Sequence, residues 1–411
     1  MSHPPVEPGT IAIIGAGTMG AGIAQVAAAG GWTVELMDVS PPVAHAAVAG
    51  IGTRLDRLVE KGRLTAAARD DIASRLLVAT CANCLAGSDI VLEAIVEDLD
   101  VKTAVLTGVL PALRDDAIIA TNTSSLSVTE LGDRIGRPSR TVGMHFFNPA
   151  PLMKLVEVIA GRHTDAAVVD RVAAVGASWG KVVARAADVP GFIVNHVARP
   201  YYLEAFRILE DGFAPVAVID GAMKTLGGFR MGPFELTDLI GQDVNAATTR
   251  SVWAQLDHPP LLHPSRVQER LVAGGHLGRK SGRGVYDHSG EAPTPALAVE
   301  ARSLAMSDEL ATSVDAFVAG ASTGTGSALE RYVFARVLVS IIAQGALANE
   351  RGVADRADID AALMYGVNYP KGPFTWADEI GIATCCRLLD ALNATVSDGR
   401  FAVPESLSSR V

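Results

Sequence analysis

The sequence is poor in several residue types that would mark other classes of protein. Its 411 residues include four cysteines, too few for a disulfide framework, and only 5% aromatic residues. Lysine and arginine, 35 in total, are outnumbered by 45 aspartates and glutamates, which gives a net charge of −10. This acidic balance argues against nucleic acid as the main partner.

Long hydrophobic runs are also missing. No run reaches the roughly 18 apolar residues of a membrane span, and the N-terminus, residues 1–8, is too short and polar for a signal peptide. We therefore expect a cytoplasmic protein that does not enter a membrane. Cys81 and Cys84 form an isolated C-x-x-C without a second pair or a nearby histidine, so we interpret them as incidental thiols and expect no metal site.

The stretch Gly15-Ala-Gly-Thr-Met-Gly20 is the most informative motif of the N-terminal half. It follows an apolar run at 11–14 and precedes an alanine-rich helical pattern at 21–29. Strand, tight turn and helix in this order are typical of a dinucleotide-binding βαβ unit; the alternative is a glycine turn in another kind of βαβ unit. A second apolar run, 32–37, ends at Asp38, where such folds place the acid that binds the ribose.

Each glycine of this motif has a predicted task. Gly15 permits the tight turn, Gly17 lets the backbone approach a pyrophosphate at the helix N-terminus, and Gly20 lets helix and strand pack closely. No arginine follows Asp38 directly, since the next residues are Val39-Ser-Pro41. The predicted cofactor is therefore NAD rather than NADP.

Strand patterns alternate with helical patterns up to about residue 189. Helices are expected through residue 64 and over 65–76, and the expected strands that follow are 90–94, 117–121, 141–145 and 155–159. We predict an α/β domain over residues 1–189 with a Rossmann-like, doubly wound, mostly parallel sheet. Ligands of such sheets bind beyond the carboxyl ends of the strands, and the polar candidates there are Glu93, Glu97, Asn122, Ser124, His145 and Asn148.

The C-terminal half has an almost entirely helical pattern. A long apolar helix is expected to start at Pro190-Gly191 and to run to about Leu209, within a helical domain over 190–287. Residues 288–328 are rich in small and polar residues and are interpreted as a linker with at most one helix.

The final segment, residues 329–411, repeats the first helical one. Met231-Gly-Pro-Phe234 and Lys371-Gly-Pro-Phe374 lie 140 residues apart, and the same offset relates Asp220 to Asp360. A constant offset without a gap indicates a duplicated helical domain.

His145 and Glu157 are the candidates for acid–base chemistry. A lone histidine at a strand end is usually structural, but Glu157 lies within the apolar run 155–159, where an unpaired carboxylate would be costly to bury. A carboxylate that holds a histidine stabilises the imidazolium and selects its tautomer, which makes a good general base near neutral pH. Such a base beside a nicotinamide site indicates alcohol oxidation, in which the base takes the hydroxyl proton and hydride leaves to the ring.

Two further polar stretches have open interpretations. Thr121-Asn-Thr-Ser-Ser125 follows a strand and either lines the cofactor site or caps the next helix, a task that Ser125, Ser127 or Thr129 could perform. The basic cluster at residues 54–63 forms either a solvated helix face or a surface for phosphates.

Together these motifs resemble the L-3-hydroxyacyl-CoA dehydrogenase family. The matching stretches, in order, are 15–20, 122–125, 145–149, 155–157, 190–195, 231–234 and 278–282. The resemblance covers residues 10–287 densely and the repeat, down to about 390, more loosely. It implies a Rossmann domain followed by two all-α domains of the 6-phosphogluconate dehydrogenase C-terminal type. It also implies NAD-dependent oxidation of an (S)-3-hydroxyacyl-CoA to the 3-oxoacyl-CoA.

The resemblance also implies a role for each matched residue. His145 would be the base, Glu157 its orienting partner, and Ser124 and Asn195 would hydrogen-bond the substrate oxygens. Arg54 and Lys61 would meet coenzyme A. The residues expected to line NAD are Gly15, Gly17, Thr18, Met19, Gly20, Asp38, Glu97, Lys102, Asn122, Asn148 and Lys280.

Within the family, the chain looks most like the 3-hydroxyadipyl-CoA dehydrogenases of phenylacetate breakdown. The stretches that carry this likeness are 197–202, 236–245 and 366–370. The alternative substrate is 3-hydroxybutyryl-CoA, as in short-chain fatty-acid β-oxidation. An adipyl substrate carries a distal carboxylate that needs a cation or donor, and the candidates are Lys154, Arg199 and Lys224.

The duplicated domain affects the oligomeric state that we expect. In single-copy relatives the helical domain forms the dimer contact, so a second copy in the same chain could cover that surface. We expect either a monomer in which 190–287 packs against 329–395 as a pseudo-dimer, or a homodimer.

Two other functions fit parts of the pattern. A dehydrogenase of the 2-hydroxyacid or 6-phosphogluconate type commonly uses a lysine base, which the His145–Glu157 pairing argues against. A catalytically silent NAD(H)-binding or crystallin-like protein would not need His145, Glu157, Ser124 and Asn195 all present, as they are here.

Overall fold

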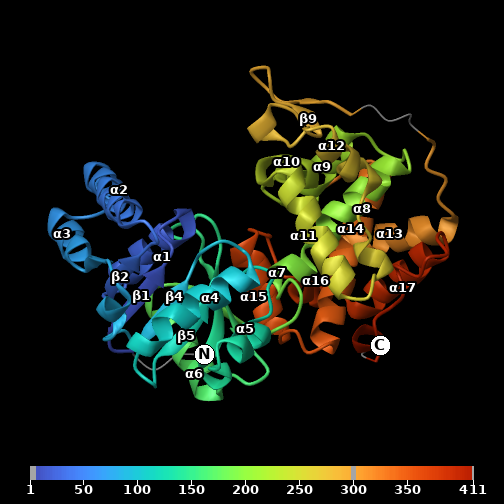
Figure 1. Cartoon of the computed structure of the whole chain (residues 1–411). Helices are drawn as coiled ribbons and strands as arrows, with labels where there is room; N and C mark the ends of the chain where they lie inside the picture. The colour runs from blue at the N-terminus through green and yellow to red at the C-terminus, as the bar shows by residue number, and fades with distance from the viewer. Residues whose placement is uncertain (1–5, 298–301, 410–411) are drawn as a thin grey trace. The chain divides into compact units, whose positions relative to one another are not determined.

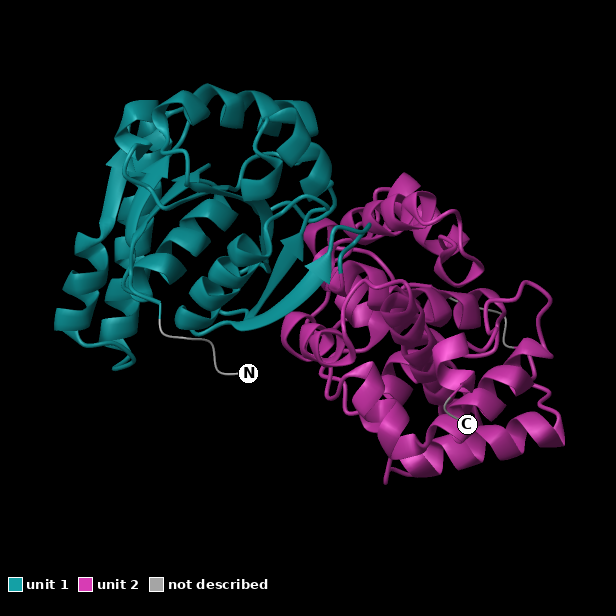
Figure 2. Cartoon of the chain, turned by 90° about the horizontal axis from the view of Figure 1, so that it is seen from below, with its two compact units in different colours: residues 1–192 teal, residues 193–411 magenta. Residues whose placement is uncertain are grey.

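The computed structural model describes residues 6–297 and 302–409. The chain divides into two compact units, unit 1 over residues 1–192 and unit 2 over residues 193–411 (Figures 1 and 2). We describe each unit by itself.

Unit 1 is built on one sheet, which has eight strands within the described residues, in the order β3-β2-β1-β4-β5-β6-β7-β8. The first six strands run parallel to their neighbours, β7 is antiparallel to β6, and β8 is parallel to β7. The predicted mostly parallel α/β sheet is confirmed. The strands are β1 (Thr10–Ile14), β2 (Thr33–Met37), β3 (Leu76–Ala79), β4 (Ile90–Glu93), β5 (Ile118–Thr121), β6 (Thr141–Phe146), β7 (Leu155–Ala160) and β8 (Val182–Ala187).

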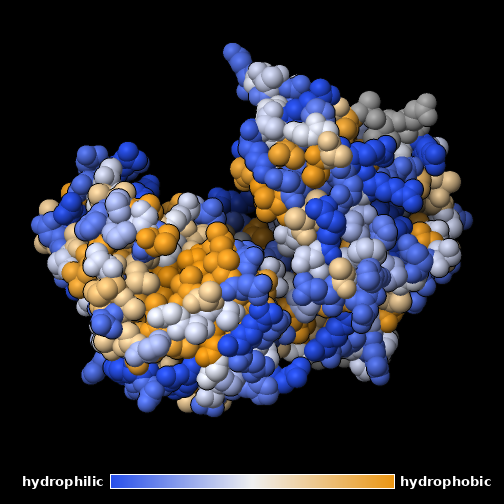
Figure 3. Space-filling view, in the orientation of Figure 1, coloured by the Kyte–Doolittle hydropathy of each residue, from blue (hydrophilic) through white to orange (hydrophobic). Residues whose placement is uncertain are grey.

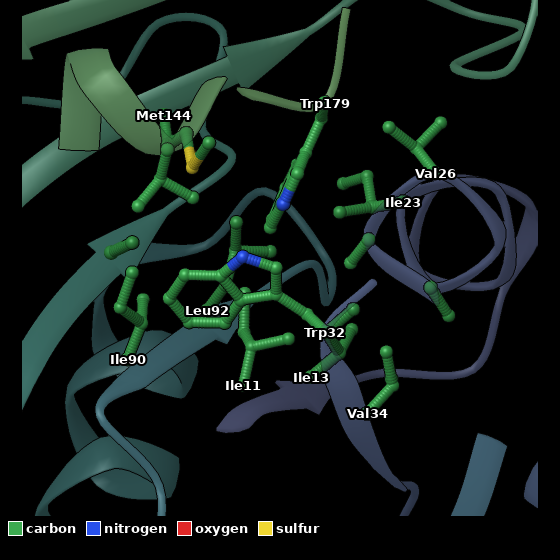
Figure 4. Close-up of a cluster of buried hydrophobic side chains, with 14 of the residues drawn as sticks. Ile11, Ile13, Ile23, Val26, Trp32, Val34, Ile90, Leu92, Met144 and Trp179 are labelled. Carbon is green, nitrogen blue, oxygen red and sulfur yellow. The ribbon is translucent and has the colours of Figure 1, made fainter. Parts of the chain in front are cut away.

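Helices cover both faces of this sheet because alternate side chains of its strands are apolar in both directions. In β1, Ile11 and Ile13 belong to one buried cluster, whereas Ala12 and Ile14 belong to another. The larger cluster includes Trp32 and Trp179, whose rings meet edge to face at 6.0 Å (Figure 4). The helices of unit 1 are α1 (Thr18–Ala29), α2 (Pro41–Glu60), α3 (Ala66–Ser74), α4 (Leu99–Val109), α5 (Val128–Arg134) and α6 (Ala166–Ser178).

Two details of unit 1 differ from the sequence-based expectation. The helix expected over residues 65–76 ends at Ser74, and Leu76 already starts β3. The strand β8 was not expected at all. Both strands lie at the margins of the sheet. β3 has only four residues and exposes Leu77, and in β8 only two of the six residues are buried, so neither shows a clear apolar strand pattern.

Unit 2 is helical, and its two halves follow the same plan. The first half contains α7 (Val194–Val197), α8 (Arg199–Glu210), α9 (Val216–Thr225), α10 (Pro233–Ile240), α11 (Gln242–Gln255) and α12 (Arg266–Ala273). The hairpin β9 (Tyr286–Asp287) and β10 (Thr294–Pro295) follows. The second half contains α14 (Ala328–Glu350), α15 (Arg356–Gly366), α16 (Pro373–Ile380), α17 (Ile382–Asn393) and α18 (Glu405–Ser408).

The long helix expected from Pro190 to Leu209 is wrong in both its start and its continuity. Gly191 and Phe192 have positive φ angles of 80° and 47°, so the chain turns here and helix starts only at Val194. The helix then breaks at Ala198, because Pro200 in the next turn has no N–H to donate. In the second half the equivalent segment is the single helix α14.

The segment expected to be a linker, 288–328, contributes to the fold of unit 2. It contains α13 (Asp308–Ala321), which packs against α14, α16 and α17 and buries Leu310, Val314 and Phe317. Residues 298–301 of this segment lie outside the described residues.

The duplication is visible in matching hydrogen bonds. Asp220 accepts from the backbone N–H groups of Phe234 and Glu235 at 2.9 and 3.0 Å. Asp360, 140 residues later, accepts from those of Phe374 and Thr375 at 2.8 Å each. In both halves the buried or half-buried carboxylate thus caps the N-terminus of the helix that opens with Gly-Pro-Phe.

The two halves pack against each other. Helix α14 lies along α8 and α9. Phe229 and Tyr369, which occupy the same position in the two copies, contact each other at 5.0 Å between ring centroids. A contact between equivalent residues is what a pseudo-twofold arrangement produces.

A buried ion cluster joins the halves. Glu204 on α8 accepts from Arg336 Nε on α14 at 2.8 Å and also pairs with Arg207. Burial would raise the pKa of Glu204, but the positive charges of Arg336, Arg207 and Arg400 outweigh it and lower the pKa from 4.5 to about 2. The carboxylate therefore stays ionised in the folded unit.

Helix α14 is the one described helix that is long and apolar enough to cross a membrane by length and composition. In the structure, 89% of its most apolar window is buried inside the protein. It is the central helix of unit 2.

We predict that Glu204→Gln destabilises unit 2 by about 3–5 kcal/mol, because Arg336 and Arg207 lose their anion inside the protein. Since the pKa of Glu204 falls from 4.5 to about 2 on folding, its contribution is complete above pH 4.5 and is lost as the pH drops toward 2. Urea unfolding at several pH values measures both effects. The wild type's advantage over the variant should shrink across this acidic window.

The control is Asp378→Asn, which breaks the exposed ion pair with Arg356 on the second half. Exposed pairs contribute about 0–1 kcal/mol, so this variant should unfold almost like the wild type. Equal losses of unfolding free energy in the two variants would show that the buried cluster stabilises unit 2 no more than an exposed ion pair does.

Candidate active site

The glycine motif forms the turn between β1 and α1. Gly15 has a φ angle of 102°, and a Cβ atom there would lie 2.6 Å from the backbone oxygen of Ala94. A Cβ on Gly20 would lie 1.7 Å from the backbone oxygen of Gly15. Both positions therefore require glycine for the turn itself.

Gly17 differs from the other two glycines. It is the N-cap of α1, provides no side-chain acceptor, and a Cβ atom added to it would meet no atom within 4 Å. The exposed Thr18 and the half-buried Met19 follow it in the first helical turn. The N-terminus of α1 thus has open space beside Gly17 and no side-chain cap, which suits the pyrophosphate of a dinucleotide.

A cavity of about 680 Å³ lies beside this turn. Asp38, at the end of β2, lines it and accepts from the backbone N–H groups of Ala16 and Ser40 at 2.9 and 3.1 Å. Most of the other lining residues are apolar, among them Val39, Val96 and Val101. Figure 3 shows hydrophobic residues gathered on the surface around β4 and α4, on this side of unit 1. An apolar cavity with one carboxylate at its rim fits the adenosine half of NAD.

Lys102 takes part in a buried ion network at the end of β4. Its Nζ lies 2.8 Å from Glu93 Oε2 and 3.4 Å from Glu97 Oε2, and the lysine side chain is 1% exposed. Thr121 also donates to Glu93. Lys102 is thus held by two carboxylates, and its predicted contact with NAD stays a prediction.

Glu97 organises the loop after β5. Its Oε1 accepts from the hydroxyl of Thr123 and the backbone N–H of Ser124, both at 2.8 Å, and from the N–H of Ser125 at 3.1 Å. Burial would raise the pKa of Glu97, but the Thr123 hydroxyl and the charge of Lys102 outweigh it and lower the pKa. The ionised carboxylate therefore fixes the position of Ser124.

The structure shows which residue caps the helix after 121–125, and the cofactor contact of this stretch stays a prediction. Ser127 is the N-cap of α5, since its hydroxyl accepts from the N–H of Glu130. Asn122 instead accepts from the N–H of Phe146 at 2.8 Å and so ties the ends of β5 and β6 together. Asn148 is exposed two residues beyond β6.

His145 and Glu157 face each other across the antiparallel pair β6–β7. The distance from His145 Nδ1 to Glu157 Oε2 is 2.7 Å, with the histidine 6% and the glutamate 0% exposed. Because Nδ1 is engaged by a carboxylate, the lone pair of the neutral ring lies on Nε2. The ring centroids of Phe147 and Phe192 lie 4.5 and 5.8 Å from the centroid of the imidazole, and the two rings restrict its rotation.

The other predicted residues are dispersed. Arg54 and Lys61 are exposed on and just after α2, and Arg54 donates to Gln25 at 2.9 Å. Asn195, on α7, and Lys280, which pairs with Asp243 at 2.6 Å, belong to unit 2. Their contacts are therefore given only within unit 2.

Sequence reasoning missed Asp188, the residue after β8. Its carboxylate accepts from the hydroxyl of Ser127 and from the N–H groups of Val128 and Thr129, at 2.7, 3.0 and 2.7 Å. It therefore holds the N-terminus of α5 in place. An acidic residue just after an apolar strand was the available signal, but the strand itself was not recognised.

Comparisons with known proteins agree with this geometry. The family model of the 3-hydroxyacyl-CoA dehydrogenase NAD binding domain matches residues 10–189. The model of the C-terminal domain of the same family matches twice, at 191–288 and 332–411. The second match reproduces the duplication in unit 2.

Curated and solved relatives point the same way. A 3-hydroxyadipyl-CoA dehydrogenase of Escherichia coli K12 is 39% identical, with 95% of each chain covered. A 3-hydroxybutyryl-CoA dehydrogenase of Bradyrhizobium diazoefficiens is 40% identical over 69% of this chain and 97% of the relative. The crystal structure of a 3-hydroxybutyryl-CoA dehydrogenase from Escherichia coli K12 superposes with a TM-score of 0.88, at 37% identity and 98% coverage of both chains.

The sheet, the glycine turn and these matches define an NAD-binding oxidoreductase of the Rossmann class. The chain belongs to the 3-hydroxyacyl-CoA dehydrogenase family and is an NAD-dependent 3-hydroxyacyl-CoA dehydrogenase. When bound, NAD accepts the hydride that leaves the substrate alcohol.

We predict opposite outcomes for two glycine variants. Gly17→Ala should fold normally and lose about tenfold or more in NADH affinity, because its methyl group enters the space where the pyrophosphate is expected. Gly20→Ala should lose about 1–3 kcal/mol of stability, because the turn must move to relieve the clash with Gly15. Thermal unfolding and NADH fluorescence titration separate the two effects.

Gly87→Ala is the control, since Gly87 is exposed, has no atom within 4 Å of an added Cβ and lies outside the motif. It should leave both measurements unchanged. Unaltered NADH affinity in Gly17→Ala would contradict the placement of the pyrophosphate.

Proposed function

We propose that the chain oxidises (S)-3-hydroxyadipyl-CoA to 3-oxoadipyl-CoA, in a phenylacetate-type catabolic route, with His145 as the general base. The likeness to a 3-hydroxyadipyl-CoA dehydrogenase over 95% of both chains supports the substrate. The hydrogen bond between His145 and Glu157 is the observation that carries the mechanism. The alternative substrate is 3-hydroxybutyryl-CoA, which relatives of similar identity are named for.

His145 takes the proton of the 3-hydroxyl group through Nε2. Glu157 accepts from Nδ1–H and so leaves Nε2 as the nitrogen that can accept the proton. As the ring becomes an imidazolium, the buried carboxylate stabilises its charge. This division of roles is supported by the complete burial of Glu157, which would be costly without a cation.

Ser124 and Asn195 donate hydrogen bonds to the substrate oxygens and stabilise the charge that develops on them. For Ser124 the support is its position, held through Glu97 after β5. For Asn195 it is the match of 190–195 to the family motif and its absence from the second copy, where Ala335 takes its place.

The cofactor contacts follow the geometry of unit 1. The first turn of α1, from Gly17 to Gly20, binds the pyrophosphate, and Asp38 binds the ribose. Glu97, Lys102, Asn122 and Asn148 complete the NAD site in unit 1. Lys280 belongs to unit 2 and is assigned to NAD from its match to the family motif at 278–282. Arg54 and Lys61 bind phosphates of coenzyme A, a role that suits exposed cations on an acidic protein.

Oxidation of NADH with 3-oxoadipyl-CoA and with acetoacetyl-CoA, followed by absorbance, tests the proposed function. The wild type should prefer the adipyl substrate. His145→Gln should lower kcat by about 10²–10⁴-fold, the usual contribution of a general base, while NADH binding stays near normal. His163→Gln, at an exposed histidine of the same unit, is the matched control and should keep full activity.

Two results would contradict this assignment. Full turnover by His145→Gln would remove the histidine from the base role. A wild type that prefers acetoacetyl-CoA would favour the short-chain alternative.

We also propose that the chain is a monomer whose helical halves form an internal pseudo-dimer. The packing of α14 on α8 and α9, and the buried bond between Arg336 and Glu204, support it. The mass in solution, measured by light scattering, should equal that of one 42.7 kDa chain. Twice that mass would favour the homodimer. The cytoplasmic location expected from the sequence stays a prediction.

A further inference from the structure

Arg199, the first residue of α8, is a buried cation without an anion. It is 4% exposed, and its guanidinium lies 5.0 Å from the ring centre of Tyr202. Within the described residues, its polar neighbours are neutral: Nη1 lies 3.4 Å from both the Asn245 backbone oxygen and Thr249 Oγ1, and Nη2 lies 3.4 Å from Asn195 Oδ1. Nε is buried and has no hydrogen-bond partner.

These contacts do not compensate a buried charge. A distance of 3.4 Å is at the long end for an N–H···O bond, and charged groups inside proteins are ordinarily paired with an opposite charge. Burial accordingly lowers the pKa of Arg199. The other two arginines that are buried among the described residues, Arg207 and Arg336, both bind Glu204.

The second helical copy shows that the fold does not need this arrangement. We call Asn195, Arg199, Asn245 and Thr249 the Arg199 cluster. The same offset of 140 residues places Ala335, Val339, Cys385 and Leu389 at the equivalent positions, all 0% exposed. One copy thus fills these positions with apolar side chains, and the other keeps a cation and three polar groups there.

A second unsatisfied donor lies near Arg199. The hydroxyl of Tyr369 is buried and has no hydrogen-bond partner among the described residues. Burial raises the pKa of Tyr369, and the positive charge of Arg199 acts against this rise. Tyr369 also lines a largely apolar cavity of about 290 Å³ together with Tyr201, Phe229 and Leu236. Arg230 also lines this cavity and Arg199 does not, so Tyr369 is the residue that links the cavity to Arg199. A buried cation, a hydroxyl and apolar walls near one another are the elements of a site for a carboxylate at the end of a short hydrocarbon chain.

The length of an adipyl chain fits the short distance between Asn195 and Arg199. In 3-hydroxyadipyl-CoA the distal carboxylate carbon is three carbon–carbon bonds from the hydroxyl carbon, which spans about 4 Å when extended. Asn195, which we propose to bind a substrate oxygen, precedes Arg199 by four residues, and the two side chains are in contact. A substrate bound at Asn195 can therefore bring its far end to the guanidinium.

We propose that Arg199 binds the distal carboxylate of a dicarboxylic 3-hydroxyacyl-CoA, with the Tyr369 hydroxyl as a second donor. The inference rests on the proposed function and deepens it, since it names the residue that selects the substrate class. The other two candidate cations are less suited to bind the distal carboxylate. Lys224 is paired with Glu235 at 2.5 Å, and Lys154 is exposed in unit 1.

The test compares two substrates of equal length, 3-hydroxyadipyl-CoA and 3-hydroxyhexanoyl-CoA, which differ only in a carboxylate or a methyl group at the far end. Arg199→Val, which installs the residue of the second copy, should lower kcat/KM for the adipyl substrate by about 10²-fold or more, because the carboxylate loses its buried partner. The hexanoyl value should stay within about threefold or rise, because the pocket becomes apolar. Lys224→Gln is the matched control and should change neither value.

Two further measurements keep the result unambiguous if folding is disturbed. The melting temperature of Arg199→Val should equal or exceed that of the wild type, since an unpaired buried charge has been removed. Arg199→Lys, which keeps the charge but not the fork geometry, should retain part of the adipyl preference, about tenfold below the wild type.

The possible failures are distinguishable. If the wild type prefers the adipyl substrate and Arg199→Val keeps that preference, the inference is wrong and the proposed function stands. If both substrates lose activity equally, Arg199 only positions Asn195, which also overturns the inference. If the wild type itself does not discriminate between the two substrates, both the adipyl assignment and the role of Arg199 fall.

Discussion

The bond between His145 and Glu157 depends on a reversal of strand direction at one place in the sheet. The strands up to β6 run parallel, and β7 returns antiparallel, so residues of β6 and β7 lie directly opposite each other. This register places an imidazole against a fully buried carboxylate at 2.7 Å. A slip of one residue would turn Glu157 to the other face of the sheet, away from His145. The proposed catalytic pair is thus a property of the strand register rather than of a loop.

Several parts of this architecture could be predicted from sequence because their causes are local. The turn of Gly15, Gly17 and Gly20 has a spacing set by backbone geometry, and apolar runs mark most central strands. The pairing of Glu157 with His145 could be predicted because an acid within an apolar strand needs a partner. The constant offset between the helical copies also required only the sequence.

The features that could not be predicted depend on how the chain folds around them. Glu93 and Glu97 precede Lys102 by few residues, but the sequence does not indicate that they hold its ammonium inside the protein. The marginal strand β8 and the acid after it, Asp188, are recognisable only once the neighbouring strand and α5 are in place. Positive φ angles at Gly191 and Phe192 delay the start of α7, and Pro200 separates α7 from α8; an apolar pattern conceals both features. Local pattern therefore predicts the elements, and tertiary contacts decide their ends and their charges.

The asymmetry of the ion cluster in unit 2 has a consequence for how the duplicated halves evolve. The bond from Arg336 to Glu204 has no mirror image, because the positions that would form it with the copies exchanged are His196 and Gln344. Each half thus contributes a different charge to this contact, and two identical copies could not form it. The two halves can therefore change independently: the positions of the Arg199 cluster are polar in one half and apolar in the other.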